Sequence, residues 1–502
     1  MFMNKYTAIN IGPVVSTITM GRKPRELWAA SYLFSHLMKC VYNEVKQCKY
    51  QIISPSEVDD SKLGVGLLPD RLFFKGECNF NDIRNQALAK FVIDTKIQQS
   101  VASDYFKIMY VSVDANSDSE AVKKLNNLLD CLELCKLDVN GQVMDKMYQY
   151  IKLDNYRLFD LAYKSESDRP KGTVAEYAAS QFRNHRNWKQ FVNMVNADDE
   201  RDVDAYKLFG DDVKSYHKYI CVVQADGDNV GKTVSHSSLA QGKVLEISQA
   251  LLQFGIKANN EITNYGGLPI YAGGDDLLFL APVVGLDGRT IFHLMDDLNN
   301  KSFKNVIDVV NGLNLHDDDK KLICASLSFG VSVTYYKYPL YEALESARHQ
   351  LFDIAKKKIS GKHAVAIDWR KHSGGSFSIS YSKSNEELEK AFHNVIQQSA
   401  VSDAVVSSVS HKIRSNEGLL KLWLGESDDI VRQRTLAFFK KYIEYKTEGP
   451  EYVSGDNIYK ESAMNCLYEL FKTESEIENL IKTMYGMIRI AKFVSGEEVR
   501  DE

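Results

Sequence analysis

The stretch LPIYAGGDDLLFLAP, Leu268–Pro282, places two glycines and two aspartates inside an otherwise apolar run. Short apolar runs bounded by turn residues predict buried strands, and two such runs, Leu268–Ala272 and Leu277–Ala281, flank the GGDD tetrapeptide. We therefore predict a tight β-hairpin whose glycines adopt backbone angles closed to other residues. Because adjacent carboxylates at a turn repel each other, the pattern also predicts a positive partner for Asp275 and Asp276.

A third carboxylate follows an earlier apolar run, YICVVQADGD, at Tyr219–Asp228. In a ferredoxin-like sheet the first strand lies beside the second strand of the hairpin, so its carboxyl end approaches the hairpin turn. This places Asp226 close to Asp275 and Asp276, and three carboxylates at one sheet edge predict a site for Mg²⁺ or Mn²⁺. Gly227 permits close backbone approach and offers a carbonyl ligand. Either motif alone is equally well explained as a turn, since Asp and Gly favour turns.

The β-α-β-β-α-β order of a ferredoxin-like unit occurs twice along the chain. The first unit is predicted to contain strands at Tyr6–Ile11, Tyr50–Ser54, Arg71–Gly76 and Phe106–Ala115, and helices at Arg25–Val45 and Asn81–Val101. The second is predicted to contain a strand at Tyr219–Asp228, a helix at Leu239–Tyr265, the GGDD hairpin, a helix at Arg289–Asn311, a strand at Leu322–Tyr336, and an appended helix and strand at Leu340–Lys357 and His363–Asp368. The topology is repeated, whereas the sequence is not.

These patterns predict an α+β protein in four parts. A ferredoxin-like unit spans residues 1–118, a charged helical insert spans 119–216, and a second ferredoxin-like unit with the GGDD hairpin spans 217–372. The rest of the chain, 373–502, is predicted to be an all-helical C-terminal domain.

Composition narrows the class of protein. The chain has 502 residues, 44% of them hydrophobic and 26% charged, which is typical of a folded protein of several domains. It has no apolar run long enough to span a membrane and no signal-peptide pattern at its start, so we expect a cytoplasmic protein without a membrane partner. The net charge of −5 predicts that any contact with nucleic acid is local. Eight scattered cysteines, with only Cys131 and Cys135 closely spaced, favour reduced thiols over a zinc site.

The GGDD hairpin and the upstream DGDNVG resemble the polymerase/cyclase palm in the large subunit of type III CRISPR effector complexes, a relative of the diguanylate-cyclase palm. INIGPVVSTITMGRKPRELWAASYLFSHLM, Ile9–Met38, is similar to the opening of the first palm in the III-B branch. SLSFGVSV is similar to a late palm strand, and LFDIAKKKISGKHAVAIDWRKHSGG, Leu351–Gly375, to the segment that closes the palm. These matches occur in the family's order, and the helical C-terminal domain also fits.

The resemblance implies a function. In this family the effector complex carries a guide RNA, and pairing of that RNA with a target RNA switches on the palm. The palm then converts ATP into an adenylate second messenger in antiviral defence. The expected partners are therefore other type III CRISPR effector subunits, crRNA and target RNA through the complex, and ATP, with Mg²⁺ or Mn²⁺ as cofactor.

The resemblance also implies roles for individual residues. Asp226, Asp275 and Asp276 are expected to be catalytic and to hold the metal ions. The residues expected to bind nucleotide are Gly227, Gly273, Gly274 and Lys362. Lys362 is a cation suited to phosphate, although a solvated lysine in a turn explains it equally well. Arg22, Lys23 and Arg25, at the start of the first long helix, are expected to contact nucleotide or RNA, or else to form a solvated basic turn.

Three departures from the family pattern change the expectations. Many members begin with a nuclease domain that carries a His-Asp metal motif; here the palm begins within the first dozen residues, so we expect no DNase activity. The single His-Asp pair, His316-Asp317, lies in a polar stretch and is expected to be a loop. The cysteine-rich zinc module is also missing, because Asn184–Tyr216 contains no cysteine. Third, LPDRLFF has Asp70 where relatives usually have asparagine.

Asp70 bears on the product. The first palm has no carboxylate pair of its own, so it is expected to bind the second substrate molecule. The usual product is cyclic oligoadenylate, but some nuclease-lacking members join ATP to S-adenosylmethionine (SAM) to give SAM-AMP. A carboxylate in the acceptor pocket favours the cationic methionine end of SAM and repels a triphosphate. Asp70 as the cap of a turn at Pro69 is the competing interpretation, so both products stay open.

Two other classes of protein remain to be compared. A catalytically silent scaffold subunit of an RNA-guided complex needs no carboxylates, and the intact DGD and GGDD motifs disfavour it. A stand-alone diguanylate-cyclase-like enzyme needs neither the second ferredoxin-like unit nor the helical C-terminal domain.

Overall fold

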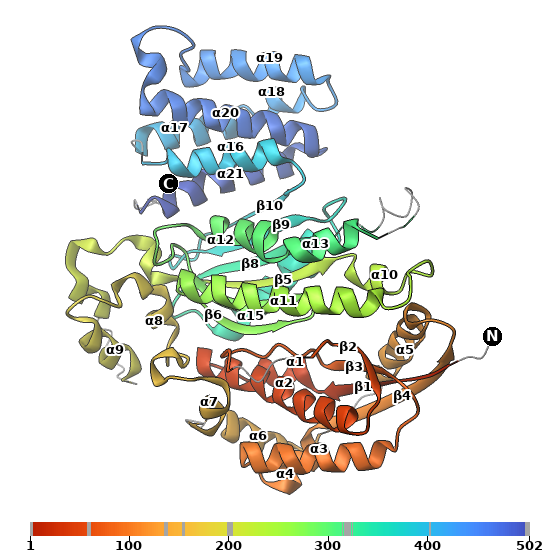
Figure 1. Cartoon of the computed structure of the whole chain (residues 1–502). Helices are drawn as coiled ribbons and strands as arrows, with labels where there is room; N and C mark the ends of the chain where they lie inside the picture. The colour runs from red at the N-terminus through yellow and green to blue at the C-terminus, as the bar shows by residue number, and fades with distance from the viewer. Residues whose placement is uncertain are drawn as a thin grey trace.

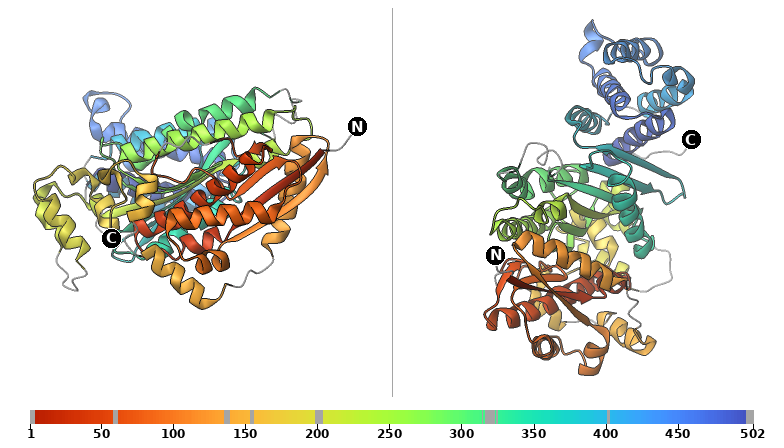
Figure 2. Two further views of the ribbon diagram at one scale, coloured as in Figure 1. Left: turned by 60° about the horizontal axis from the view of Figure 1, so that its bottom comes forward. Right: turned by 90° about the vertical axis from the view of Figure 1, so that its right-hand side faces the viewer.

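The computed structural model describes residues 4–57, 62–134, 139–152, 156–197, 204–313, 315, 323, 325–400 and 403–496. His316-Asp317 and Cys135 lie outside the described residues. The protein is a mixed α+β molecule with two β-sheets and many helices, as the sequence predicts. In Figure 2 the two sheets and a bundle of C-terminal helices form three successive tiers.

The first sheet has the strand order β2-β3-β1-β4, and each neighbouring pair is antiparallel. Its strands are β1 (Asn4–Gly12), β2 (Gln51–Ser54), β3 (Arg71–Lys75) and β4 (Lys107–Ala115). This order is that of a ferredoxin-like unit. The central strand β1 alternates between two apolar cores, with Tyr6 and Ala8 in one and Ile9 and Ile11 in the other.

The second sheet repeats this order and extends it by two strands. Its order is β6-β7-β5-β8-β9-β10, with only the β8–β9 pair parallel. The strands are β5 (Tyr219–Asp228), β6 (Leu268–Gly273), β7 (Asp276–Pro282), β8 (Ser326–Tyr335), β9 (Ala364–Arg370) and β10 (Ser376–Ser382). Strands β5 and β8 are buried along most of their length. The first half of β5 is a continuous apolar run, whereas β8 alternates apolar residues with serine, glycine and threonine.

Helices cover the sheets and connect them (Figure 1). In the first unit they are α1 (Val14–Ile18), α2 (Pro24–Gln47), α3 (Phe80–Thr95) and α4 (Gln99–Tyr105), and in the insert α5 (Asp118–Glu133), α6 (Gly141–Lys152), α7 (Tyr156–Ala162), α8 (Val174–Ala178) and α9 (Trp188–Asn196). In the second unit they are α10 (Val230–Val234), α11 (Lys243–Tyr265), α12 (Ile291–Asp297), α13 (Lys304–Asn311) and α15 (Leu340–His349), the last continued by the π-helical segment η6 (Gln350–Ala355). The C-terminal helices are α16 (Glu386–Gln397), α17 (Asp403–Ser415), α18 (Glu417–Lys421), α19 (Asp428–Phe438), α20 (Gly455–Thr473) and α21 (Ile477–Val494).

The structure corrects two predicted boundaries. The helix predicted at Asn81–Val101 is two helices, because Lys96 adopts a left-handed conformation with φ of 63° and ends α3. The C-terminal part predicted from residue 373 begins with a strand: β10 pairs with β9, and the helices start only at Glu386. Alternating serines in β10 leave one face polar, which weakens the apolar signal of a strand.

The two units pack closely along α11 and β6. Gly255 of α11 approaches the first unit so closely that a Cβ there would lie 3.1 Å from Leu67 and 2.7 Å from the Ala272 carbonyl oxygen. The Ala272 amide donates to the Gly66 carbonyl oxygen at 3.2 Å, which joins β6 to the first unit. The hairpin is thereby held against the loop that precedes β3.

Within the described residues, no helix is both long and apolar enough to cross a membrane.

Candidate active site

The hairpin of β6 and β7 carries Asp275 and Asp276 to the edge predicted from the sequence. The turn lies at Gly274, whose φ of 68° requires glycine, and Gly273 pairs with Asp276 across the hairpin. A Cβ on Gly273 would overlap the ring of Tyr271, so this position also excludes a side chain. The strands end as predicted, and the two carboxylates project where the sheet stops.

Strand β5 brings Asp226 opposite Asp276, its direct partner in the β5–β7 register. The Gly227 amide donates to the Asp275 carbonyl oxygen at 3.1 Å. A Cβ on Gly227 would lie 2.7 Å from the Asp275 Cβ and 2.9 Å from its Oδ2, so the close approach of the two strands depends on this glycine. The backbone therefore brings together all three predicted carboxylates.

Asp228, the second aspartate of the DGD motif, has a different environment. It is fully buried and accepts hydrogen bonds from the hydroxyls of Ser326 and Ser328, each at 2.8 Å, and from the His363 amide at 3.0 Å. Burial raises its pKa, and these donors oppose the rise. Asp228 thus ties β5 to β8 and to the start of β9.

Lys356 is the residue that the sequence prediction missed. Its ammonium pairs with Asp226, lies 3.8 Å from the Asp228 Oδ1 and donates to the Gly227 carbonyl oxygen at 3.2 Å. It places a positive charge at this edge, but on Asp226 rather than on Asp275 or Asp276, for which a partner was predicted. The run of three lysines, residues 356–358, gave no sign of which side chain points inward.

Glycine also explains how Lys356 reaches the site. A Cβ at Gly330 of β8 would overlap the Ala347 carbonyl oxygen and the Leu351 amide, so α15 and η6 can lie directly on the strand only because residue 330 is glycine. Lys356 follows η6 immediately and extends over the end of β5. Lys362 lies nearby, with its ammonium 3.5 Å from the Asn229 Oδ1.

The site has the donors that a divalent cation requires. Asp276 Oδ1 is buried and finds no hydrogen-bond partner among the described residues. Burial raises the pKa of both Asp275 and Asp276, and the charge of Asp276 adds to the rise at Asp275. The Gly227 carbonyl and Asp226 are engaged by the Lys356 ammonium, a replaceable cation. Two groups of three described residues have ligating atoms within 4.8 Å of one another, and neither group contains Asp226, Asp275 or Asp276. The oxygens of these three carboxylates must therefore move closer together to share an ion.

Asp70 of the first unit faces this edge. Its carboxyl belongs to the loop before β3, and burial raises its pKa to about 6, with Arg71 opposing and Asp276 adding to the rise. Tyr271 lies beside both units, since Asp276 and Asp70 each contribute to raising its pKa. Asp70 is therefore next to the hairpin, where an acceptor substrate is expected.

The basic residues at the start of α2 lie elsewhere. The Arg22 guanidinium stacks 4.8 Å from the centre of the Tyr341 ring. Tyr341 is in the first turn of α15, just beyond the end of β8 that pairs with Tyr219, whereas the carboxylates lie at the other end of β5. Arg22 and its neighbours Lys23 and Arg25 are thus separated from the carboxylate edge by the length of a strand.

Comparison with known proteins agrees with this geometry. The family model described as Cas10/Cmr2, second palm domain, matches residues 219–366, and the model of the CRISPR-associated protein Cmr2, N-terminal, matches residues 6–101. The CRISPR system Cmr subunit Cmr2 of Pyrococcus furiosus is 31% identical over 230 residues, which cover 41% of this chain and 23% of that protein. The matched region thus spans about a quarter of the curated relative.

Solved structures share the fold. The type III-B Cmr-beta complex bound to cognate target RNA contains a chain with a TM-score of 0.56 and 10% identity, covering 93% of this chain and 83% of that chain. The apo state of the type III-B Cmr-beta complex contains a chain with a TM-score of 0.58 and 11% identity, covering 99% of this chain and 82% of that chain. Fold and site define a palm-domain protein with a carboxylate-lined edge. These matches support the resemblance to type III-B large subunits that the sequence predicted.

Proposed function

We propose that this chain is the catalytic large subunit of a type III-B CRISPR effector complex, a target-RNA-activated nucleotidyltransferase that makes an adenylate second messenger from ATP. The observation that carries the proposal is the pairing of Asp226 with Asp276 beside Asp275, around a glycine that admits no side chain. A protein that used this fold only as a scaffold would have no need of three carboxylates and a lysine at one strand edge.

The residues divide the chemistry between them. Asp226, Asp275 and Asp276 would hold Mg²⁺ or Mn²⁺, which, when bound, lowers the barrier to attack by polarising the acceptor hydroxyl and the leaving pyrophosphate. Gly273 and Gly274 leave the turn uncovered for the nucleotide. In the reaction, the acceptor oxygen forms a bond to the α-phosphorus of ATP, and the bond from that phosphorus to pyrophosphate breaks.

The two lysines suit the polyphosphate. Lys356 is held at the carboxylate edge by η6, and a metal ion bound to Asp226 would leave its ammonium available. It is then free to pair with the phosphates, which neutralises charge on the leaving group. Lys362, in the turn before β9, extends the same positive edge.

Asp70 would select the acceptor. It lies across from the hairpin, in the unit that lacks a carboxylate pair, so it contacts the second substrate rather than the metal ions. Its negative charge favours SAM over a second ATP and so the product SAM-AMP. An uncharged Asp70 carboxyl group would permit a second ATP and so cyclic oligoadenylate.

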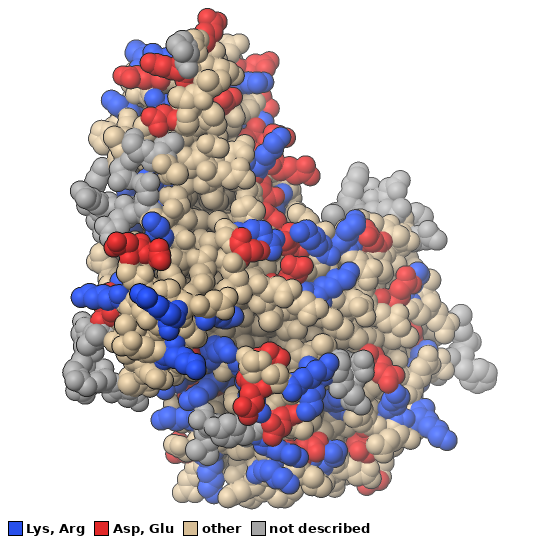
Figure 3. All heavy atoms as spheres, turned by 60° about the vertical axis from the view of Figure 1, so that its left-hand side comes forward, with Lys and Arg blue, Asp and Glu red and all other residues tan. Residues whose placement is uncertain are grey.

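A basic hollow gives RNA a local surface on an otherwise acidic chain. A cavity of about 580 Å³ lies between the insert, the first unit and α11. Its lining includes the basic residues Lys62, Lys164, Arg169, Lys171 and Arg183, with Asp168 as the acidic one. Figure 3 shows Lys and Arg side chains gathered on the face that carries the insert. We place the contact with RNA, or with the subunit that holds it, on this face.

The test is synthesis by the assembled complex. The complex is incubated with target RNA, Mg²⁺ or Mn²⁺, labelled ATP, and SAM present or absent, and the products are identified by mass spectrometry. We expect a target-dependent adenylate product and release of pyrophosphate. A complex that binds target RNA normally but releases no pyrophosphate with either metal ion would establish the scaffold interpretation instead.

A further inference from the structure

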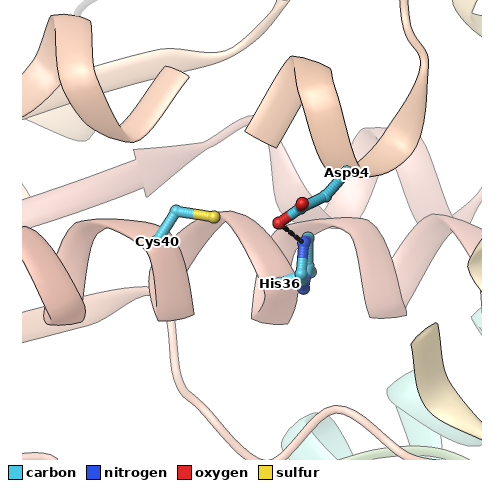
Figure 4. Close-up of side chains that lie close together, drawn as sticks. All are labelled: His36, Cys40 and Asp94. Carbon is cyan, nitrogen blue, oxygen red and sulfur yellow. Dashed lines mark hydrogen bonds and ion pairs between the residues drawn. The ribbon is translucent and has the colours of Figure 1, made fainter. Parts of the chain in front are cut away.

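Three potential ligands converge on one another inside the first unit, far along the chain from the GGDD hairpin. His36 and Cys40 are four residues apart on α2 and therefore share a face of the helix. Asp94, near the end of α3, faces them, and its Oδ2 lies 3.2 Å from the His36 Nε2. The three ligating atoms all lie within 4.8 Å of one another. Figure 4 shows the Cys40 sulfur and the His36 ring directed at the same carboxylate.

The cluster is enclosed. Only 10% of the His36 side chain and 13% of the Asp94 side chain are exposed, and Cys40 is buried. Tyr32 stacks on the His36 ring at 6.1 Å between centroids. Burial lowers the pKa of His36 and raises that of Cys40 to about 12.

Further contacts fix Asp94 in this orientation. Its other oxygen, Oδ1, pairs with Lys90 at 2.7 Å, so Oδ2 is left for His36 and Cys40. The Lys90 side chain is 59% exposed, and solvent screens its repulsion of a cation. The Asp94 carbonyl oxygen accepts from the Arg157 Nε of α7 at 2.9 Å. Lys90 thus orients the carboxylate, as outer contacts orient the ligands of metal sites, and Arg157 anchors the backbone that carries it.

We propose that His36, Cys40 and Asp94 form a zinc site with one coordination position left for water. A thiolate, an imidazole and a carboxylate together suit Zn²⁺, whereas Mg²⁺ and Mn²⁺ prefer oxygen ligands alone. Bonds of about 2.0–2.3 Å place tetrahedral ligands roughly 3.3–3.8 Å apart, so the present separations need only a small contraction. On binding, the S–H bond of Cys40 breaks, bonds from zinc to sulfur, nitrogen and oxygen form, and one proton is released to solvent.

The second set of three ligating atoms provides a contrast. Asp296, Glu389 and His393 join α12 to α16, and His393 lies 2.8 Å from the Asp296 carboxylate. The ammonium of Lys383, itself buried, already pairs with both Asp296 and Glu389. This set is an ion-paired contact between the second unit and the C-terminal helices. Lys90 pairs with Asp94 through Oδ1, which leaves Oδ2 facing His36.

Zinc at this position would join α2 to α3 and stabilise the docking of the insert. Two insert helices contact the end of α3 by side-chain hydrogen bonds: Arg157 binds the Asp94 carbonyl oxygen, and the Tyr150 hydroxyl donates to the Thr95 carbonyl oxygen at 2.6 Å. The carboxylate edge lies elsewhere, so this site is independent of the proposed nucleotidyltransferase activity.

The test is metal content of the full-length chain, purified without a polyhistidine tag from zinc-supplemented cells. We expect about one zinc per chain. Cys40→Ser and Asp94→Asn should lower zinc affinity by at least the roughly 10- to 100-fold that follows loss of an outer contact. Cys48→Ser, an exposed thiol near the end of the same helix, and His393→Gln, in the second set, should leave the zinc content unchanged.

Cobalt substitution gives a readout that does not depend on stability. Chelator-treated protein titrated with Co²⁺ should develop a near-ultraviolet thiolate-to-cobalt absorption band, with release of one proton, and Cys40→Ser should lose the band. Since Mg²⁺ or Mn²⁺ at the carboxylates gives no such band, failure here and failure of the proposed activity are distinguishable. Wild-type protein without zinc and without the cobalt band would overturn the proposal, as would a band that persists in Cys40→Ser.

Discussion

The two sheets have the same geometry where β1 and β5 end, but not the same chemistry. In the first unit the Ile11 amide donates to the Asp70 carbonyl oxygen at 3.0 Å, and in the second the Gly227 amide donates to the Asp275 carbonyl oxygen at 3.1 Å. Each aspartate directly precedes the strand that pairs with the central one. Asp70 is therefore the positional counterpart of Asp275.

The neighbouring positions differ in charge. Asn10, opposite Arg71, occupies the place of Asp226, opposite Asp276. The Arg71 guanidinium binds Asp130 and Glu133 of α5, each at 2.7 Å, and Asn10 donates to Glu133 at 2.6 Å. The edge of the second sheet thus concentrates negative charge, whereas at the edge of the first sheet Arg71 forms ion pairs with α5. The comparison teaches that a duplicated fold can carry different charge patterns at equivalent strand ends.

The strongest way to break this comparison is to remove the charge from the second edge. Asp275→Ala combined with Asp276→Ala should reduce messenger synthesis by roughly 1,000-fold or more, since the bound ions supply several kcal/mol and about 4 kcal/mol corresponds to that factor. Assembly and RNA binding should persist, because removing crowded like charges does not destabilise the hairpin. The measurement is pyrophosphate release by the assembled complex, with Asp308→Ala, an exposed acid on α13, as control.

Exchanging the central-strand residues tests the equivalence directly. Asp226→Asn should lower synthesis by about 100-fold, because an amide binds divalent ions weakly. The reciprocal change, Asn10→Asp, should leave activity unchanged, since Arg71 opposes any cation at the first edge. A loss of only twofold in Asp226→Asn would contradict the facing-strand geometry of the metal site.

Replacing the two lysines at the second edge should reduce synthesis by different amounts. Lys356→Met removes a charge held among the carboxylates and should reduce synthesis by about 100-fold, since a hydrogen bond to a charged group contributes roughly 1.5–3 kcal/mol. Lys362→Met should cost about tenfold, because its ammonium lies farther out, beside Asn229. Single-turnover rates with saturating ATP distinguish the two. A larger loss in Lys362→Met would make that residue the principal phosphate contact.

Much of the fold follows from local sequence pattern. The hairpin, the apolar run of β5, the alternating pattern of β8 and the spacing of helices between them predict the second sheet, because these signals depend on neighbouring residues. The break at Lys96 escapes prediction because lysine rarely adopts a left-handed conformation, and only the packing of α3 and α4 requires it here. Strand β10 was not predicted because its serines alternate with Phe, Ile and Tyr and weaken the apolar signal.

The sequence predicted the part of the candidate site that depends on which strand residues face each other. The position of Asp226 could be predicted from its place at the end of a strand. Lys356 reaches the site because Gly330 lets η6 lie directly on β8, and this contact joins segments that are distant in the sequence. The grouping of His36 and Cys40 with Asp94 is equally invisible, since a single cysteine and histidine on one helix gain a third ligand only through tertiary packing. The preference for reduced thiols over zinc rested on cysteine spacing alone.

The prediction that decides the product concerns Asp70. If the first edge holds SAM, its carboxylate pairs with the cationic methionine end, and Asp70→Asn should weaken SAM use by about 10- to 100-fold while ATP use at the hairpin is unchanged. If the acceptor is a second ATP, the same substitution removes an anion beside a triphosphate, and synthesis should stay equal or improve. Burial raises the pKa of Asp70 to about 6, so its charge is largely present at pH 7.5 and largely absent at pH 5. Wild-type preference for SAM should therefore fall as pH is lowered, and in Asp70→Asn it should not. Mass spectrometry of products formed with both substrates present measures each outcome. A wild-type product without a methionine moiety would exclude SAM, and the first edge would then be an ATP site in which Asp70 only restrains the turn after Pro69.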